Sequence, residues 1–120
     1  MNGARFLLDT NFIIGLLKGN PAIADLVRER GMVLAECAYS SITRMELLGY
    51  PGITGEHEQA ITGLLSVLTY LAITPEVEAE TIQLRRAFKL KLPDAIILAT
   101  ARVHGLELLT LDQDLAAVGR

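Results

Sequence analysis

The chain has 120 residues, of which 51% are hydrophobic and 21% charged, and its 11 basic and 14 acidic side chains give a net charge of −3. This composition excludes a disordered chain, and no apolar run reaches the ~20 residues of a membrane span. The single cysteine, Cys37, excludes an internal disulfide framework and a multi-cysteine zinc site, which suits a reducing cytosol. The acidic balance and the absence of Trp argue against a basic nucleic-acid binder with a base-stacking platform.

Short apolar runs predict the strands. The first run follows Arg5 and is ended by Asp9, an acid that also makes a signal peptide unexpected. Because the chain is short and has no linker or repeat, we expect one domain over residues 1–120. The predicted strands are 5–8, 32–39, 68–73 and 107–111.

Start and stop signals predict the helices between these strands. Gly19, Gly31 and Gly105 are typical helix stops, and a proline stands at several of the starts. The predicted helices are 10–18, one from Asn20-Pro21 to Gly31, one from Ser40 or Ser41 to Gly49, 56–67, one opened by Thr74-Pro75-Glu76, and 93–104. This alternation predicts an α/β fold, a parallel sheet of about four to five strands with helices on both faces.

Acidic residues follow the strands and open the helices. Asp9 ends the first strand, Asp112 and Asp114 come just after the last, and Glu46 and Asp94 lie in or near the first turns of two helices. In open α/β sheets, ligands bind at the carboxyl ends of the strands. Carboxylates that meet at that edge can hold a hard divalent cation such as Mg²⁺ or Mn²⁺, which activates water for attack on a phosphate.

Each of these acids also has an ordinary structural interpretation. Asp9 could cap the helix after it, Asp94 could match the helix dipole, and Glu46 could lie on a solvated face. Asp112 and Asp114 could be turn residues, and Cys37 is expected to be a small core residue.

Four segments of the chain resemble the PIN domains, and specifically the VapC-type ribonuclease toxins. The four occur in the order found in that family and span essentially the whole chain, and the stretch around Pro93-Asp94 is the most specific. They are Leu7-Leu8-Asp9-Thr10-Asn11, Ser41-Ile42-Thr43-Arg44-Met45-Glu46-Leu47, Lys91 to Ala101, and Leu109-Thr110-Leu111-Asp112.

The resemblance implies a function and a set of site residues. It implies a PIN-like fold, a ribonuclease that leaves 5′-phosphate products, a homodimer, and a small antitoxin whose tail enters the acidic groove. By the same resemblance, Asp9, Glu46, Asp94 and Asp112 hold Mg²⁺ or Mn²⁺ and carry catalysis, with Asp114 as an alternative or additional fourth acid. Thr10, Asn11 and Thr110 match residues that position groups in such sites.

The negative net charge is compatible with an RNA substrate. Without the four acids of the implied site, the net charge of −3 becomes +1, and a bound cation's own charge also counts. Basic residues could then contact phosphates, with Arg44 the best placed because it lies two residues before Glu46. The others are Arg85, Arg86, Lys89 and Lys91, for which a solvated helix face is the alternative.

Three other classes of protein were weighed against this one. An aspartyl phosphatase of the haloacid dehalogenase type would use Asp9 as nucleophile, Lys91 as charge partner and Asp112 as metal ligand, but Asn11 stands where such enzymes have a second Asp. A phosphorylatable receiver domain is disfavoured because no Asp lies between Glu29 and Pro93. A catalytically silent binding module on the PIN fold stays open.

Overall fold

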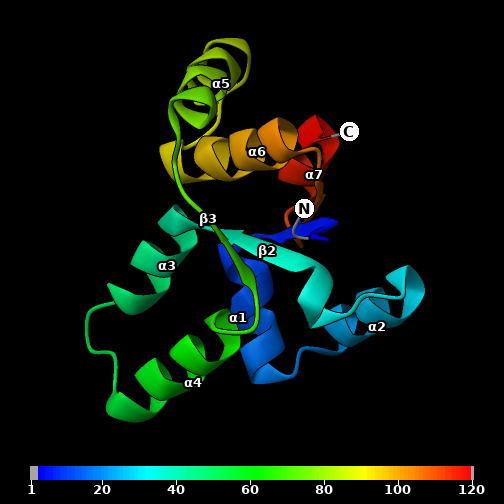
Figure 1. Ribbon diagram of the computed structural model, residues 1–120, viewed down its shortest axis with the longest axis vertical. Helices are drawn as coiled ribbons and strands as arrows, with labels where there is room; N and C mark the ends of the chain where they lie inside the picture. The colour runs from blue at the N-terminus through cyan, green and yellow to red at the C-terminus, as the bar shows by residue number, and fades with distance from the viewer. Residues whose placement is uncertain (1–2, 120) are drawn as a thin grey trace.

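The computed structural model describes residues 3–119 and builds them around a parallel four-stranded sheet (Figure 1). The strands are β1 (Phe6–Leu8), β2 (Cys37–Ser40), β3 (Thr69–Leu71) and β4 (Glu107–Leu109). Their order across the sheet is β3-β2-β1-β4, and every neighbouring pair is parallel. The chain therefore moves outward from β1 through β2 to β3, and then crosses back to place β4 on the other side of β1.

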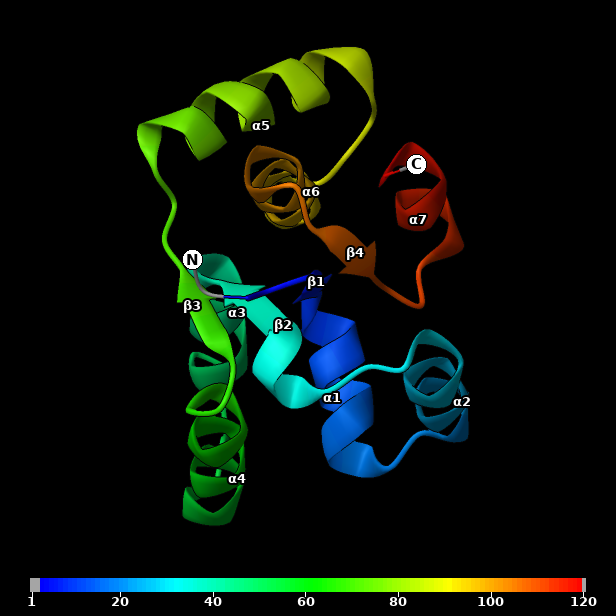
Figure 2. The same ribbon diagram turned by 45° about the vertical axis from the view of Figure 1, so that its right-hand side comes forward.

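Helices cover both faces of this sheet, which confirms the predicted α/β class (Figures 1 and 2). Helices α1 to α4 lie on one face, and α6 lies on the other with α5 and α7 packed around it. The bounds are α1 (Thr10–Lys18), α2 (Pro21–Arg30), α3 (Ser41–Leu48), α4 (Gly55–Leu65), α5 (Pro75–Ala87), α6 (Leu92–His104) and α7 (Gln113–Gly119), with a short 3₁₀ helix at Leu34–Glu36.

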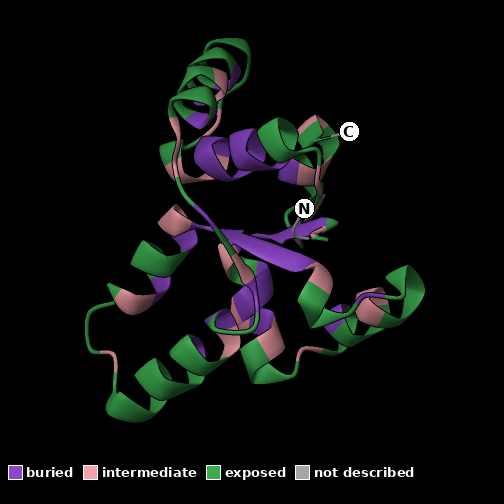
Figure 3. Ribbon diagram, viewed as in Figure 1, coloured by how far each residue is buried: buried purple, intermediate pink, exposed green. Residues whose placement is uncertain are grey.

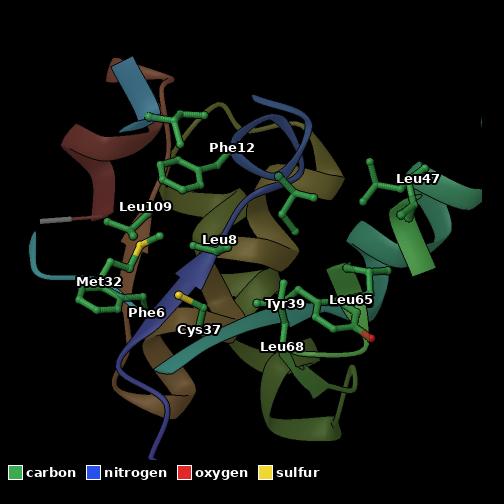
Figure 4. Packing of buried hydrophobic residues seen from close by; sticks show 13 residues of the cluster. Phe6, Leu8, Phe12, Met32, Cys37, Tyr39, Leu47, Leu65, Leu68 and Leu109 are labelled. Atoms are coloured by element: carbon green, nitrogen blue, oxygen red, sulfur yellow. The ribbon is translucent and has the colours of Figure 1, made fainter. Parts of the chain in front are cut away.

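The alternation of side chains along β1 divides the core into two layers. Phe6 and Leu8 point to the α1 side and pack with Phe12 (Figure 4). Leu7 belongs to a separate buried cluster with Ile97 of α6, and all of β1 is buried (Figure 3). Because both faces are buried, the strand reads as a continuous apolar run rather than an alternating one. Among residues 3–119, no helix combines the length and apolarity that crossing a membrane requires.

The predicted helix ends are confirmed where a cap residue marks them. The side chains of Asp9, Asn20 and Ser40 accept hydrogen bonds from backbone amides at the starts of α1, α2 and α3. Gly19 ends α1 with φ 71°, a left-handed conformation that a residue without Cβ adopts at no steric cost.

Three predicted strands need correction. The strand predicted over 68–73 is confined to Thr69–Leu71, and the chain leaves the sheet before α5. The strand predicted over 32–39 begins only at Cys37, because the 3₁₀ turn at Leu34–Glu36 occupies its first half. The last strand ends at Leu109 rather than at residue 111, and the helix α7 that follows was not predicted. The signal for α7 was Asp112, whose carboxylate accepts hydrogen bonds from the amides of Asp114 and Leu115 and so caps the helix.

Candidate active site at the carboxyl edge of the sheet

Asp9 lies at the carboxyl end of the central strand β1, where α1 begins and where the edge strand β4 also ends. Its backbone N–H donates to the Leu109 carbonyl at 3.2 Å, which brings the ends of β1 and β4 together. Its carboxylate accepts from the Phe12 amide at 2.7 Å, and only 5% of the residue is exposed. Asp9 therefore does cap α1, as its structural interpretation from the sequence predicts. The same carboxylate also lies at the point where the strand order reverses, which is a common ligand site in α/β sheets.

Glu46 reaches the same edge of the sheet from α3. Its Oε1 accepts a hydrogen bond of 2.7 Å from the Thr10 hydroxyl, which belongs to the first turn of α1. The Thr10 hydroxyl oxygen also lies 3.0 Å from that of Thr43, a residue of α3 that the sequence analysis did not single out. These two contacts join α1 to α3 beside Asp9, and the i, i+3 spacing of Thr43 and Glu46 on one helix face is the signal that could have identified Thr43.

Asp112 and Thr110 come from the turn between β4 and α7. The Thr110 hydroxyl oxygen accepts from the Asp112 amide at 3.0 Å. The Asp112 carboxylate accepts from the Asp114 and Leu115 amides at 3.0 and 3.1 Å. The turn therefore holds the Asp112 side chain in a defined direction through bonds that lie within residues 110–115.

The electrostatics of Asp9 show which of these acids lie near one another. Burial raises the pKa of the Asp9 carboxyl above its ordinary value, and the charges of Asp94 and Asp112 raise it further. Hydrogen bonds from the Thr110 hydroxyl and the Phe12 amide lower the pKa again by favouring the ionised form. Asp9 is thus a buried carboxylate with two like charges nearby.

Asp94 connects the fourth acid to this group. It lies half-buried in the first turn of α6, and burial is the main cause that raises its pKa. The charges of Asp112 and Glu46 also raise this pKa, while Lys91 lowers it. The acids Asp9, Glu46, Asp94 and Asp112, from four separate segments of the chain, therefore act on one another at one edge of the sheet.

The donor set suits a hard divalent cation. It consists of carboxylates flanked by the hydroxyls of Thr10 and Thr110, and none of the ion pairs formed within residues 3–119 neutralises any of the four acids. In the described part of the chain, however, no three Asp, Glu, His or Cys side chains converge closely enough to hold one ion between them. Asp9, Glu46 and Asp112 each accept hydrogen bonds from nearby groups of the chain. Mg²⁺ typically keeps several waters and takes only one or two carboxylates directly.

Comparisons with known proteins identify the family to which this fold and edge belong. A model of the PIN domain matches residues 6–120. The chain belongs to the PIN domain family.

Solved PIN-like structures resemble this one over most of their length. A toxin–antitoxin complex from Klebsiella pneumoniae is 36% identical with a TM-score of 0.75, over 89% of this chain and 86% of that one. FitAcB from Neisseria gonorrhoeae is 25% identical with a TM-score of 0.75, and the match covers 95% of this chain and 92% of FitAcB. A chain of DNA-bound VapBC from Salmonella typhimurium is 26% identical with a TM-score of 0.69, and the match covers 86% of this chain and 83% of that one. A comparison with curated proteins found no match.

The other residues that the sequence predicts for the site of this PIN domain lie outside the group formed by Asp9, Glu46, Asp94 and Asp112. Asp114 is exposed in the first turn of α7 and is not among the charges that act on Asp9 or Asp94, which favours Asp112 as the fourth acid. Asn11 and Arg44 are exposed on α1 and α3.

The other basic residues are exposed, and the cysteine is buried. Of Arg85, Arg86, Lys89 and Lys91, all exposed, Lys91 acts on Asp94. Cys37 is a buried core residue whose thiol donates to the Val33 carbonyl at 3.4 Å, and burial raises its pKa to about 11, so it is not a nucleophile.

Proposed function

We propose that this PIN domain is a metal-dependent endoribonuclease and the toxin of a toxin–antitoxin pair. One observation carries the nuclease proposal: four carboxylates from separate segments gather at the switch point of the sheet. The charges of Asp94 and Asp112 raise the pKa of Asp9, those of Asp112 and Glu46 raise the pKa of Asp94, and none of the ion pairs within residues 3–119 includes one of the four acids. Repulsion between like charges in such a cluster opposes folding, so the cluster favours a bound cation. Family membership favours this hydrolase over the phosphatase alternative.

In this proposal Asp9, Glu46, Asp94 and Asp112 hold Mg²⁺ or Mn²⁺. When bound, the ion would supply Lewis acidity that activates a water and stabilises the charge developing on the RNA phosphate. The hydroxyl of Thr10 holds the Glu46 carboxylate in place, and that of Thr110 interacts with the Asp9 carboxylate.

The chain's basic residues are proposed to bind the RNA backbone. Arg44 lies exposed on α3, less than one turn from Glu46, and Lys91 precedes α6 and acts on Asp94. Cations at these positions can contact phosphates that flank the bond to be cleaved. Asn11, exposed in the first turn of α1, is proposed to position substrate beside them.

The partner proposal rests on the acidic character of the edge and on the relatives. The 36% identical structure is a toxin–antitoxin complex. We propose that an antitoxin peptide places an Arg or Lys among Asp9, Glu46 and Asp94, because a guanidinium can bind carboxylates in bidentate fashion. The proposal includes a homodimer, which the exposed apolar side chains of Met45 and Tyr50 support. It also includes a cytoplasmic location, where RNA substrates occur.

The test is cleavage of single-stranded RNA by the purified chain in Mg²⁺ or Mn²⁺, with and without chelator. Asp94→Asn is expected to lower the rate about 100-fold or more, since loss of a ligand removes several kcal/mol of transition-state stabilisation. Asp112→Asn should lower the rate more than Asp114→Asn, because the charge of Asp112 acts on Asp9 and Asp94 whereas that of Asp114 does not. Asp25→Asn, on the exposed face of α2, is the neutral control.

Two outcomes would overturn the proposal. Cleavage that persists in chelator, or that survives Asp94→Asn, would exclude metal-assisted hydrolysis at this site. Binding of RNA without cleavage under any divalent cation would identify the chain as the silent binding module instead.

A further inference from the structure

Thr43 differs from the other buried threonines in where its hydroxyl points. Thr43 is 0% exposed, and its hydroxyl oxygen lies 3.0 Å from that of Thr10 on another helix. Thr81 and Thr100 are also buried, but each donates at 2.7 Å to the carbonyl four residues earlier in its own helix. Thr43 lies in the first turn of α3, and the residue four positions earlier, Tyr39, belongs to β2.

The direction of the hydrogen bonds follows from counting protons. An ionised carboxylate only accepts, so the 2.7 Å contact between Thr10 and Glu46 uses the single hydroxyl proton of Thr10. The Thr10 oxygen must then act as acceptor toward Thr43. The chain of bonds therefore runs from Thr43 to Thr10 to Glu46, and each hydroxyl has one defined orientation.

This chain of bonds connects a rigid residue to a mobile one. Thr43 is enclosed by the core and β-branched, which leaves its side chain little rotational freedom. Glu46 is exposed and has a longer side chain with several rotamers. Because the two lie on the same face of α3, the Thr10 hydroxyl sits between them and transmits the position of the buried residue to the exposed carboxylate.

We propose that Thr43 is a positioning residue that acts through Thr10 to orient the Glu46 carboxylate toward the acidic edge of the sheet. This rests on the proposed function in so far as Glu46 is one of the acids that hold the ion. Thr43 itself touches neither substrate nor metal in this proposal.

The experiment measures Mn²⁺ binding to the full chain by calorimetry without RNA. Thr43→Val removes the donor at nearly constant shape and is expected to weaken binding about 3- to 10-fold, less than the ~10- to 100-fold typical for direct partners of metal ligands. Thr43→Ser keeps the hydroxyl and should bind within about twofold of the parent. Thr81→Val is the matched control, because it removes a buried hydroxyl that bonds only within α5.

A second measurement is independent of the metal. The ¹³C signal of the Glu46 carboxylate in the metal-free protein, recorded at one pH, reports the hydrogen bond from Thr10. Thr43→Val should shift this signal, whereas Thr43→Ser and Thr81→Val should not. In a Thr10→Val background, where the chain of bonds is already broken, Thr43→Val should cause no further shift.

The outcomes separate this inference from the proposed function. If the parent binds no Mn²⁺, the proposed function fails, and the carboxylate signal alone decides the role of Thr43. If Thr43→Val leaves the signal and the Mn²⁺ affinity unchanged, or if Thr81→Val weakens binding equally, the positioning role is overturned while the nuclease proposal stands.

Discussion

At the scale of single residues, Asp9 shows how one carboxylate can have two roles. Its oxygen caps α1 through the Phe12 amide, which stabilises the fold, whereas its buried charge near Asp94 and Asp112 destabilises it. The two contributions are separable, because an Asn side chain caps a helix about as well as Asp but carries no charge.

Asp9→Asn is therefore expected to melt a few degrees above the parent in chelator, since ~1 kcal/mol corresponds to roughly 4 °C for a domain of this size. Asp9→Ala should melt lower, because loss of a cap costs about 1 kcal/mol. Mg²⁺ should raise the melting temperature of the parent by mass action and raise that of Asp9→Asn less. Thermal melts of the three proteins, with chelator and with Mg²⁺, provide the measurement.

The pH dependence of this difference has a defined sign. Because the folded state raises the pKa of Asp9, the folded protein binds more protons than the unfolded one once the pH exceeds the ordinary carboxyl range. In chelator, the free energy of unfolding of the parent, relative to Asp9→Asn, should thus be highest below the ordinary Asp pKa of about 4 and fall as the pH rises through the raised pKa of the folded state. If the parent is more stable than Asp9→Asn in chelator, and Mg²⁺ raises the melting temperatures of both equally, then Asp9 acts only as a helix cap.

At the scale of elements, the contact between α1 and α2 depends on a glycine. A Cβ on Gly15 would overlap the Cδ1 atom of Ile23, a buried side chain of α2, and would lie 3.5 Å from Asn20 Cβ. The close approach of α1 and α2 behind Asp9 therefore requires the small residue, even though glycine is a poor helix former.

Gly15→Ala is expected to destabilise the fold, because overpacking costs about 1–3 kcal/mol against roughly 1 kcal/mol gained in helix propensity. In an Ile23→Val background, which lacks the Cδ1 atom, the same substitution should be neutral or stabilising. Urea unfolding of the parent, both single variants and the double variant measures the coupling. An equal effect of Gly15→Ala in both backgrounds would show that the contact with Ile23 is not its cause.

At the scale of the whole molecule, strand order brings the four acids together. The strands β1 and β4 are neighbours (Figure 2), so Asp9 and Asp112, which follow them, come together although about 100 residues separate them in sequence. The helices α3 and α6 bring Glu46 and Asp94 to the same edge. The acidic edge is thus a surface of the folded chain, available to a cationic partner only in the native state.

Co-expression with a short antitoxin encoded beside this chain is expected to give a copurifying complex without ribonuclease activity. In the proposed mode of inhibition, a basic antitoxin residue contacts Asp9, Glu46 and Asp94 and blocks the site, so replacing that Arg or Lys by Ala should restore cleavage while the complex still forms. RNA cleavage by the mixture, with complex formation followed by size-exclusion chromatography, tests this. A complex that forms with full nuclease activity would contradict inhibition at the acidic edge.

Much of the local structure could be predicted from the sequence, because its signals act over a few residues. Asp9, Asn20 and Ser40 are caps, and Gly19 and Gly105 are stops, so the helices they bound follow from short-range hydrogen bonding and backbone sterics. The resemblance to PIN domains rested on such segments and is confirmed by the family match. The start of β2 and the helix α7 were missed, since a 3₁₀ turn and a seven-residue helix have weak periodicity.

Only the tertiary structure decided which acids lie close enough to interact electrostatically. The choice between Asp112 and Asp114 depends on which carboxylate lies near Asp94, and the hydrogen bond from Thr43 to Thr10 joins residues 33 positions apart. No local pattern contains these contacts, because the order of strands and the packing of α1 against α3 create them. The sequence by itself therefore determined the helices that carry clear start and stop residues, and the acids available. The fold determined which acids act together, because electrostatic and hydrogen-bond interactions depend on distance in space.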